Sequence, residues 1–498
     1  MKYFLGYDLG SSSVKAALLD AASGKPLASA FSPVTEMKID APRPGFAEQD
    51  PERWWQELIH ATKLLHQKFP FAKNEIGAIG ISYQMHGLIC IDKNNEPVRP
   101  AIIWCDSRAV AYGNQAFADL GTAFCLEHFL NSPGNFTASK LKWVKENEPG
   151  NYKKTVRVLL PGDFIALKMT GEPVTTISGL SEGILWDYKE NAVAQSLLDY
   201  YGIDASLLAP RVPTFGDQGM LQEAAAALLG VASGVPVCYR AGDQPNNAFS
   251  LHVLEPGEIA ATAGTSGVLY GISAKADFDL QSRVNPFVHV NHLPATPRYG
   301  VLMCLNGTGI LNSWLRREFF LNESYESMNA GALKVPMGAE GIFCYPFGNG
   351  AERILGNKNP GAQIKGIDFN RHDKYHVARA AQEGIVFSLM YGAEIMQQMG
   401  LSLSRFRAGY ANMFLSDLFS QTFANLSKCP VELYNTDGAL GAARGAGYGS
   451  KYYPHLTDCF RGMEVVKQVN PEEKDTGRIA EIYAAWKVGL EDILKKTD

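Results

Sequence analysis

Three aspartates that follow apolar runs are the side chains of this sequence best placed for acid–base or metal chemistry. Asp8 ends the run YFLGY and precedes the small turn residues Gly10–Ser13, Asp106 ends AIIWC, and Asp243 lies in AGDQP after VPVCYR. Short apolar runs bounded by turn residues predict buried strands. A carboxylate at the end of such a strand is costly unless a cation or a hydrogen-bond donor accompanies it. Each aspartate is therefore either a functional carboxylate or the cap of a turn.

Asp8 is compatible with a magnesium site beside a phosphate-binding turn. Mg²⁺ keeps several waters and is held by one or two carboxylates together with substrate phosphates, which suits an Asp directly before Gly10–Ser13. An Asx-type cap of the same turn explains Asp8 equally well. Lys15 could reach the phosphates, although an exposed strand lysine explains it equally well.

Asp243 stands where a general base is expected, after a strand and close to the middle of the chain. A carboxylate there could accept the proton of a sugar hydroxyl as that hydroxyl attacks a γ-phosphate. Most aspartates after strands are structural caps, so the position alone is a weak signal.

Two loops offer groups that suit a polyhydroxylated ligand. Gln84-Met85-His86-Gly87 follows the run IGAIGISY and combines an amide, an imidazole and an apolar wall. Asp106 could accept two hydroxyl hydrogen bonds. The structural alternatives are a hydrogen-bonded core histidine at His86 and an ion pair between Asp106 and Arg108.

The segment around Asp8 recurs in altered form about half-way along the chain. Tyr3–Asp20 reads YFLGYDLGSSSVKAALLD, and Glu258–Ser273 reads EIAATAGTSGVLYGIS. In each copy a turn of Gly, Ser and Thr separates two apolar runs, which predicts a β-hairpin. Small turn residues expose backbone N–H groups and let a polyphosphate approach closely. The pair predicts a phosphate chain held between two related domains, whereas either turn alone is explained as a stable turn.

Helix and strand patterns alternate around these turns. Asp50 followed by Pro51 predicts a helix start, and further helices are predicted over 308–320, over 372–400 and from Asn470 onward. LICID and AIIWCD predict a hairpin that ends at Asp106. The alternation predicts an α/β protein of two domains with a boundary just after Asp243.

Composition excludes several classes of protein. The 498 residues are 46% apolar and 19% charged, which is typical of a globular protein of two large domains. A formal net charge of −5 provides no basic footprint for nucleic acid. The N-terminal apolar run is too short for a signal peptide, and no stretch approaches a membrane span. The eight cysteines are scattered without a C-x-x-C pair, which indicates reduced thiols and a cytoplasmic location.

These segments together resemble the FGGY family of carbohydrate kinases, and within it the members that act on xylulose. The similarity is dense over residues 1–110, where it includes Asp8–Lys15, the FAEQDPERWW helix start, Gln84–Gly87 and Trp104–Arg108. It resumes at Phe136–Lys140, Leu160–Asp163, around Asp243, at Gly264–Gly267 and at Gly438–Ala443. In order and spacing the resemblance covers most of the chain.

The resemblance implies an α/β fold of two actin-like (ribonuclease-H-like) domains, each with a mixed sheet flanked by helices, around a central cleft. Residues 1–244 would bind sugar and phosphate, and residues 245–498 would bind the nucleotide and end in a helical extension. The implied activity is ATP-dependent phosphorylation of the terminal hydroxyl of a ketopentose, with D-xylulose as the best match, because Gln84–Gly87 is similar to the family's ketopentose loop. ATP and Mg²⁺ are the implied cofactors, and a homodimer is the implied assembly.

Residue roles follow from the same resemblance. Met85, His86 and Asp106 would hold the sugar, Asp243 would be the general base, and Asp8 would place Mg²⁺. The residues expected to contact the nucleotide are Gly10, Ser11, Ser12, Ser13, Gly264, Thr265, Ser266, Ala411 and Asn412.

Three departures from the family pattern keep alternatives open. Cys105 stands where the family usually has Asn, and Thr175–Gly183 lacks the usual Asp-rich form, so a kinase for another ketose or polyol such as L-ribulose or L-fuculose remains an alternative. Arg407–Met413 replaces the Gly-Gly-Gly-Ala loop expected under the adenine, and its bulkier residues are expected to narrow or reshape the base pocket. A catalytically weak sugar or nucleotide sensor on the same fold is the second alternative.

Overall fold

The computed structural model describes residues 2–497, which form two compact units. Unit 1 consists of the chain up to His252 together with Phe287–Tyr299 and Thr436–Met463, and unit 2 consists of Val253–Pro286, Gly300–Asn435 and the chain from Glu464 onward. The longest segment of unit 1 thus ends close to the domain boundary predicted after residue 244, and two later segments join the same unit. The predicted boundary itself stays a prediction.

The central sheet of unit 1 has the strand order β13-β5-β1-β2-β3. Its strands are β1 (Tyr3–Leu9), β2 (Val14–Asp20), β3 (Pro26–Ser32), β5 (Ile76–Tyr83) and β13 (Val237–Gly242). β1 and β2 form the predicted antiparallel hairpin, in which Leu9 pairs with Val14. β1, β5 and β13 run parallel, so their carboxyl ends lie at one edge of the sheet. Asp8 lies near that end of β1, and Asp243 directly follows β13.

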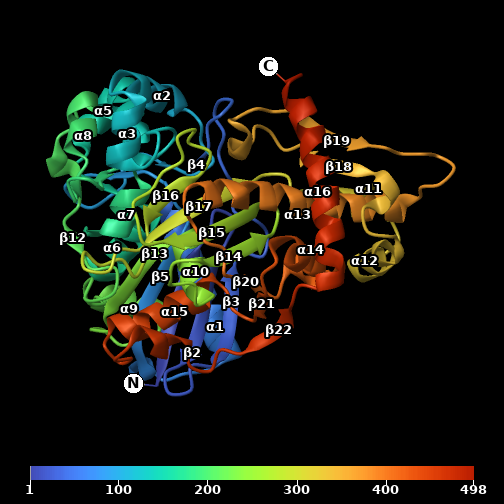
Figure 1. Cartoon of the computed structure of the whole chain (residues 1–498). Helices are drawn as coiled ribbons and strands as arrows, with labels where there is room; N and C mark the ends of the chain where they lie inside the picture. The colour runs from blue at the N-terminus through green and yellow to red at the C-terminus, as the bar shows by residue number, and fades with distance from the viewer. Residues whose placement is uncertain (1, 498) are drawn as a thin grey trace. The chain divides into compact units, whose positions relative to one another are not determined.

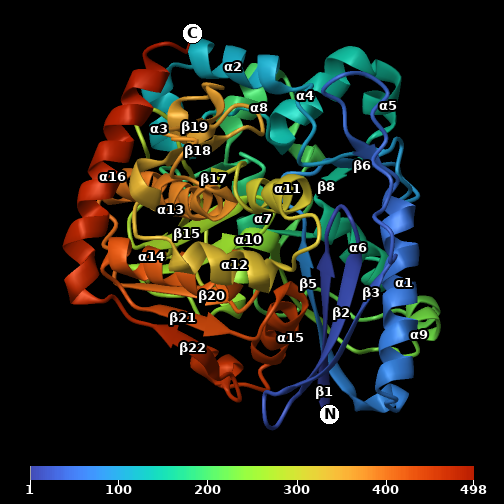
Figure 2. The same cartoon turned by 90° about the vertical axis from the view of Figure 1, so that its right-hand side faces the viewer.

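Helices cover both faces of this sheet, as Figure 2 shows with α1 on one side and α15 on the other. α1 (Pro51–Lys68) begins as predicted, because the Asp50 side chain accepts a hydrogen bond from the Glu52 amide at 3.0 Å. α15 (Gly438–Gly449) lies directly against the strand backbone. A Cβ on Gly6 would lie 1.9 Å from the carbonyl oxygen of Ala439, so this close approach requires glycine.

The other elements of unit 1 surround this core. The helices are α2 (Val110–Asp119), α3 (Thr122–Phe129), α4 (Thr137–Asn147), α5 (Pro149–Lys154), α6 (Pro161–Thr170), α7 (Ile177–Glu182), α8 (Gln195–Tyr201), α9 (Glu223–Leu229) and α10 (Asp243–Ser250). The short strands are β4 (Glu48–Gln49), β6 (Ile89–Ile91), β7 (Ala101–Ile102), β8 (Arg157–Leu159), β9 (Thr175–Thr176), β10 (Trp186–Asp187), β11 (Ala192–Val193) and β12 (Arg211–Val212).

The hairpin predicted from LICID and AIIWCD is wrong as a strand pairing. β6 pairs with β8, and β7 pairs with β4. The two predicted strands meet only in an isolated bridge between Leu88 and Ile102. Each run pairs over more residues with a strand elsewhere in the chain, and a local sequence pattern does not identify such a partner.

The sheet of unit 2 repeats the arrangement of unit 1 and extends it (Figure 1). Its strands are β14 (Glu258–Ala263), β15 (Gly267–Ser273), β16 (Asn285–Val288), β17 (Tyr299–Leu305), β20 (Arg405–Gly409), β21 (Val431–Tyr434) and β22 (Val465–Val469), in the order β16-β17-β15-β14-β20-β21-β22. β14 and β15 form the second predicted hairpin, and β14, β20 and β21 run parallel. The order β17-β15-β14-β20-β21 therefore corresponds to β3-β2-β1-β5-β13, which confirms the repeat inferred from the two hairpins.

Unit 2 is completed by helices around a second hydrophobic core. They are α11 (Gly309–Phe319), α12 (Tyr325–Lys334), α13 (Lys374–Gln398), α14 (Asp417–Ser427) and α16 (Glu473–Leu494), beside the hairpin of β18 (Phe343–Phe347) and β19 (Gly361–Lys365). The predicted helices over 308–320 and 372–400 are confirmed. The C-terminal helix starts later than predicted, because Glu472 and not Asn470 is its N-cap.

Short 3-10 helices connect several elements of both units. They are η1 (Lys73–Glu75), η2 (Ala205–Leu207), η3 (Ala339–Gly341), η4 (Arg353–Leu355), η5 (Asn412–Leu415) and η6 (Leu456–Phe460). None of the helices within residues 2–497 combines the length and the apolar character needed to span a bilayer. The eight cysteines, all within that range, form no disulfide.

Candidate active site

Asp8 lies among polar side chains and backbone near the carboxyl end of β1. The Ser82 hydroxyl donates a hydrogen bond of 2.8 Å to Asp8 Oδ1. On the other side, a Cβ on Gly438 would lie 2.3 Å from Asp8 Oδ2, so the start of α15 borders the carboxylate. Burial raises the pKa of Asp8, the hydrogen bond from Ser82 opposes this rise, and the charge of Asp437 adds to it. A cation near this carboxylate would remove the cost of its buried charge.

Lys15 and Asp437 form an ion pair beside Asp8. The Lys15 ammonium lies 2.5 Å from Asp437 Oδ2, and Lys15 is the strand partner of Asp8 in the β1–β2 hairpin. Asp437 also accepts a hydrogen bond of 2.9 Å from the Leu440 amide and so caps α15. Sequence reasoning missed Asp437, although an Asp directly before Gly-Ala-Leu-Gly-Ala-Ala is a recognisable helix-cap signal.

The turn between β1 and β2 consists of small residues in a tightly closed backbone, which lets a phosphate approach the chain. Its backbone closes through a hydrogen bond of 3.0 Å from the Gly10 amide to the Ser13 carbonyl. The carbonyl of Ser11 accepts from the Gln49 side chain at 2.7 Å, and that of Ser12 accepts from the Met37 amide at 2.8 Å. The turn carbonyls are thus used within the protein, and Ser12 is exposed at the tip.

Asp243 is the first residue of α10 and follows β13 directly. Its side chain is partly buried. Burial, and then the charge of Asp8, raise the Asp243 pKa to about 7. The structure thus brings together the two carboxylates that lie 235 positions apart in the sequence closely enough for the charge of Asp8 to act on Asp243. A pKa near neutrality is the value that suits a general base.

Buried polar atoms without partners gather around the same strand ends. Among the described residues, no hydrogen bond of ordinary geometry reaches either amide atom of Gln84, either carboxylate oxygen of Glu182, Gln244 Oε1 or Asn246 Oδ1. Buried polar atoms are hydrogen-bonded in the great majority of cases. A concentration of exceptions beside Asp243 is the property expected of a site that a polar ligand and ordered water complete.

Glu182 is the buried carboxylate of this region that sequence reasoning missed. It is fully buried, and a Cβ on Gly242 would lie 2.4 Å from its Oε2 atom, so it borders the backbone just before Asp243. Burial, and then the charges of Asp243 and Asp163, raise the pKa of Glu182 well above its usual range. Its only sequence signal is its place in Thr175–Gly183, the segment that departs from the family pattern.

Met85 and His86 follow β5 and lie beside this region. Met85 is buried, and its side chain and that of Glu182 both lie against Gly242. His86 has a left-handed backbone with φ of 62°, a conformation that costs a non-glycine residue about 1–2 kcal/mol. Its Nδ1 lies 2.9 Å from the Glu182 carbonyl oxygen, which fixes Nδ1 as the donor. The ring also contacts Phe136 and Phe287.

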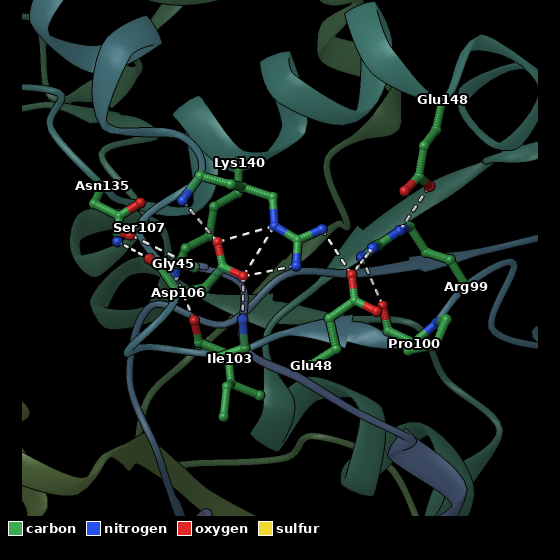
Figure 3. A network of polar contacts seen from close by, with 12 residues as sticks. Gly45, Glu48, Arg99, Pro100, Ile103, Asp106, Ser107, Asn135, Lys140 and Glu148 are labelled. Atoms are coloured by element: carbon green, nitrogen blue, oxygen red, sulfur yellow. Dashed lines mark hydrogen bonds and ion pairs between the residues drawn. The ribbon is translucent and has the colours of Figure 1, made fainter. Parts of the chain in front are cut away.

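Asp106 is fully buried and its carboxylate is saturated by groups of the protein (Figure 3). Arg108 donates to both oxygens at 2.7–2.9 Å, and the Ala47 amide donates at 2.5 Å. Arg108 also pairs with Glu48 at 2.6 Å, and Arg99 joins Glu48 to Glu148. The ion pair of Asp106 and Arg108 that the sequence offered as the structural alternative is therefore present. A direct role of Asp106 in sugar binding stays a prediction.

Unit 2 contains a cavity of about 630 Å³ beside the second hairpin turn. Among the predicted nucleotide residues, Gly264, Thr265 and Asn412 line it, whereas Ser266 and Ala411 do not. Its remaining walls include α11, α12 and the start of α14. A pocket of this size is in the range that holds a ligand as large as a nucleoside, about 300–1,000 Å³.

The altered loop over 407–413 does not close this cavity. Arg407 lies within β20, where it pairs with Glu258 and Glu432 at 3.0 Å. Tyr410 is 44% exposed and is not among the lining residues. The side chains of Arg407 and Tyr410 therefore lie in the sheet or outside the pocket, whereas Asn412 and Met413 of the same loop line it. The narrowing of the base pocket stays a prediction.

The carboxylates at the β1 and β13 ends fit a hydrated magnesium ion. Within residues 2–497, no group of three or more His, Cys, Asp or Glu side chains has metal-binding geometry. Mg²⁺ does not require one, because it is commonly held by one or two carboxylates, waters and substrate phosphates. Asp8 and Asp243, whose ionisation the charge of Asp8 makes more costly, would provide the hard oxygen donors that such an ion needs.

Comparison with known proteins decides the family. The family model of the FGGY N-terminal domain matches residues 3–250, and that of the C-terminal domain matches residues 259–450. The chain belongs to the FGGY family of carbohydrate kinases. It is therefore an ATP-dependent sugar kinase, as the resemblance of its motifs implied.

Individual relatives of this carbohydrate kinase agree over nearly the whole chain. The xylulose kinase of Bacillus subtilis (strain 168) is 30% identical over 474 residues, which cover 92% of this chain and 90% of that protein. The xylulose kinase of Escherichia coli (strain K12) is 29% identical over 450 residues, which cover 89% and 88%. The crystal structure of a protein from Brucella ovis described as a xyloylose kinase has a TM-score of 0.85 at 25% identity and covers 98% of both chains. The predicted α/β fold with two sheet-containing, actin-like domains is confirmed.

Proposed function

We propose that this carbohydrate kinase transfers the γ-phosphoryl group of ATP to the terminal hydroxyl of a ketopentose, converting D-xylulose to D-xylulose 5-phosphate. One observation carries the proposal: the Met85–His86 loop and Asp243 follow the adjacent parallel strands β5 and β13. Ligands of open α/β sheets bind at the carboxyl ends of such strands. The relatives from B. subtilis and E. coli, both named xylulose kinases, support the choice of sugar.

The acceptor sugar is held by Met85 and His86 in this proposal. Because His86 uses Nδ1 toward the Glu182 carbonyl, its Nε2 atom is the one with which it accepts a sugar hydroxyl. Met85 supplies an apolar surface for the carbon chain. Asp106 contributes by shaping the loop over 103–108, since Arg108 and the Ala47 amide occupy its carboxylate.

Asp243 accepts the proton of the attacking hydroxyl and orients that hydroxyl toward the phosphorus atom. Its pKa of about 7 keeps a useful ionised fraction at neutral pH while leaving it basic enough to take a proton. Asp8 is the residue that places Mg²⁺, which supplies neutralisation of the charge on the transferred phosphoryl group. In unit 1 the small turn residues at 11–13 offer backbone N–H groups to a phosphate, and in unit 2 the turn residues Gly264 and Thr265 line the cavity that takes the nucleoside.

The proposal is tested by measuring ADP release with a panel of ketoses and polyols. D-xylulose, L-ribulose, L-fuculose and glycerol should be compared with purified enzyme, ATP and Mg²⁺. We expect D-xylulose to give the highest kcat/KM. A higher value for another sugar overturns the choice of substrate, and binding of sugars without ADP release from any of them supports the sensor alternative. Gel filtration of the same preparation tests the predicted homodimer.

A further inference from the structure

Lys140 is a fully buried lysine in the first half of α4, and its ammonium group reaches two backbone carbonyls. Lys140 Nζ donates to the His86 carbonyl oxygen at 2.9 Å and to the Ile103 carbonyl oxygen at 3.0 Å (Figure 3 shows the second). Asp106, the carboxylate whose charge acts on it, is paired with Arg108 at 2.7 Å. The buried ammonium is therefore satisfied by main-chain oxygens.

The two carbonyls belong to the two loops that carry the predicted sugar-binding residues. We define the acceptor loops as residues 84–87, which follow β5, and residues 103–108, which follow β7. These loops come from different strands, and β7 belongs to a separate two-stranded pairing with β4. Lys140 thus joins two loops that no strand pairing holds together beyond the bridge of Leu88 with Ile102.

The contact with His86 bears directly on the orientation of the imidazole. His86 adopts a left-handed backbone, so its carbonyl points where an ordinary strand residue would not place it. Lys140 holds this carbonyl from one side, while the Glu182 carbonyl holds the ring at Nδ1 from the other. Loss of the Lys140 contact leaves a buried carbonyl without its donor, and the loop then relaxes toward an ordinary backbone conformation.

Burying the charge of Lys140 has a desolvation cost that an uncharged side chain of similar size would not have. Burial lowers the pKa of Lys140 to about 7, against the opposing effect of the nearby Asp106 carboxylate. A methionine would fill a similar volume without this desolvation cost, but it has no donor for either carbonyl. The feature that lysine provides here and methionine does not is the double hydrogen bond to the acceptor loops.

We propose that Lys140 is a positioning residue for sugar binding, which sets the geometry of the acceptor loops by holding the His86 and Ile103 carbonyls together. The inference rests on the proposed function insofar as it assigns the loops to the sugar. It adds a residue on α4 that touches neither the sugar nor the nucleotide and acts through His86.

The test compares Lys140→Met with Lys142→Met, a matched change on the same helix, where the lysine is partly exposed and pairs with Glu146 at 2.6 Å. We expect Lys140→Met to raise the KM for the sugar by about 10- to 100-fold, because small misplacements of binding groups have effects of this size. The KM for ATP should stay unchanged, and Lys142→Met should behave as wild type. A sugar KM equal to that of wild type, or an equal rise in both KM values, overturns the proposal.

Amide hydrogen exchange supplies a readout that needs no substrate. In Lys140→Met, peptides covering 84–87 and 103–108 should exchange faster than in wild type, while peptides of unit 2 should not change. Unchanged exchange in the acceptor loops, or faster exchange throughout unit 1, overturns a positioning role. If Lys140→Met does not fold, Lys140→Arg, which keeps a buried cation with several donors, is compared in the same way, and wild-type exchange in both loops is then the expected result. If wild-type enzyme turns over none of the sugars, the proposed function fails, but the exchange experiment still decides whether Lys140 holds the loops.

Discussion

Two groups of buried carboxylates in unit 1 differ in how their charges are balanced. Asp106 and Glu48 face Arg108 and Arg99 at 2.5–2.9 Å, so each negative charge has a positive neighbour. Around Asp243, burial raises the pKa values of Asp8, Asp243 and Glu182. The charge of Asp8 adds to the rise at Asp243, and the charge of Asp243 adds to the rise at Glu182.

This difference distinguishes a structural network around Asp106 from a candidate chemical site around Asp243, both within unit 1. A network whose charges are paired internally needs nothing from outside and holds the backbone in place. A cluster of carboxylates without enough cations destabilises the folded state, and a bound cation or a proton reduces this cost. The substitutions below test whether the two clusters really differ in this way.

The largest effect is expected from Asp243→Asn in the unpaired cluster. Removal of a general base lowers turnover by about 10²–10⁴-fold, and ADP release at saturating sugar and ATP measures it. Asp199→Asn is the matched control, because that aspartate is exposed and its side chain accepts a hydrogen bond from Gln195. Turnover by Asp243→Asn close to the wild-type rate would show that another group takes the proton.

Asp106→Asn should act on stability where Asp243→Asn acts on turnover. Removing one partner of a buried ion pair destabilises a protein by about 3–5 kcal/mol, because the other charge stays buried. Arg108 keeps its contact with Glu48, so we expect the lower part of this range. Urea unfolding measures the free energy, again with Asp199→Asn as control. A stability equal to that of wild type would mean that the Asp106 network is not an internally balanced structure.

The pH dependence of stability also distinguishes the two clusters, because loss of the Asp106 charge should lower stability whereas loss of the Asp243 charge should raise it. The pKa of Asp243 is raised from 3.8 to about 7, so the folded state binds this proton more tightly than the unfolded chain does. Ionised Asp243 therefore reduces stability as pH rises from 3.8 to about 7, by at most about 1.4 kcal/mol per pH unit, and the loss is constant at higher pH. Partial exposure of the side chain makes the real slope smaller.

Asp243→Asn removes this loss. Its advantage in stability over wild type should grow as pH rises to about 7 and then level off, as measured by urea unfolding in metal-free buffer across that range. An advantage that does not vary with pH would mean that Asp243 is not the group that titrates. Addition of Mg²⁺ should reduce the advantage, because a cation stabilises the ionised wild-type carboxylate.

Local sequence signals anticipated the parts of the fold that depend on neighbouring residues. The two Gly/Ser turns, the cap at Asp50 and the repeat of the hairpin were all readable, because each is encoded within a few consecutive positions. The wrong hairpin near Asp106 shows the limit: β6 and β7 pair with β8 and β4, and such partners depend on the whole fold.

The same limit applies to the site. Asp8, His86 and Asp243 were singled out because turns and strand ends mark them in the sequence. Glu182 and Lys140 carry no such mark: each lies on a short or ordinary helix and becomes informative only through burial and through the carbonyls and carboxylates around it. Burial without a counter-charge is a property of three-dimensional structure and not of spacing.

Glu182→Gln sharpens the comparison within the unpaired cluster. Burial and the charges of Asp243 and Asp163 raise the pKa of Glu182 well above its usual range, so the folded state binds this proton more tightly than the unfolded chain does. Glutamine is a neutral replacement of nearly the same shape, so below the usual pKa of glutamate the free energy of unfolding should change by about 1 kcal/mol or less. At higher pH the unfolded wild-type chain loses the proton that the folded state retains, so the variant should gain stability relative to wild type as pH rises, as Asp243→Asn does. Glu182→Ala, which leaves a cavity beside Met85 and Gly242, is the control for loss of packing and should be clearly less stable. A difference in stability that does not vary with pH would show that folding leaves the pKa of Glu182 near its usual value, and that Glu182 does not belong to the unpaired cluster.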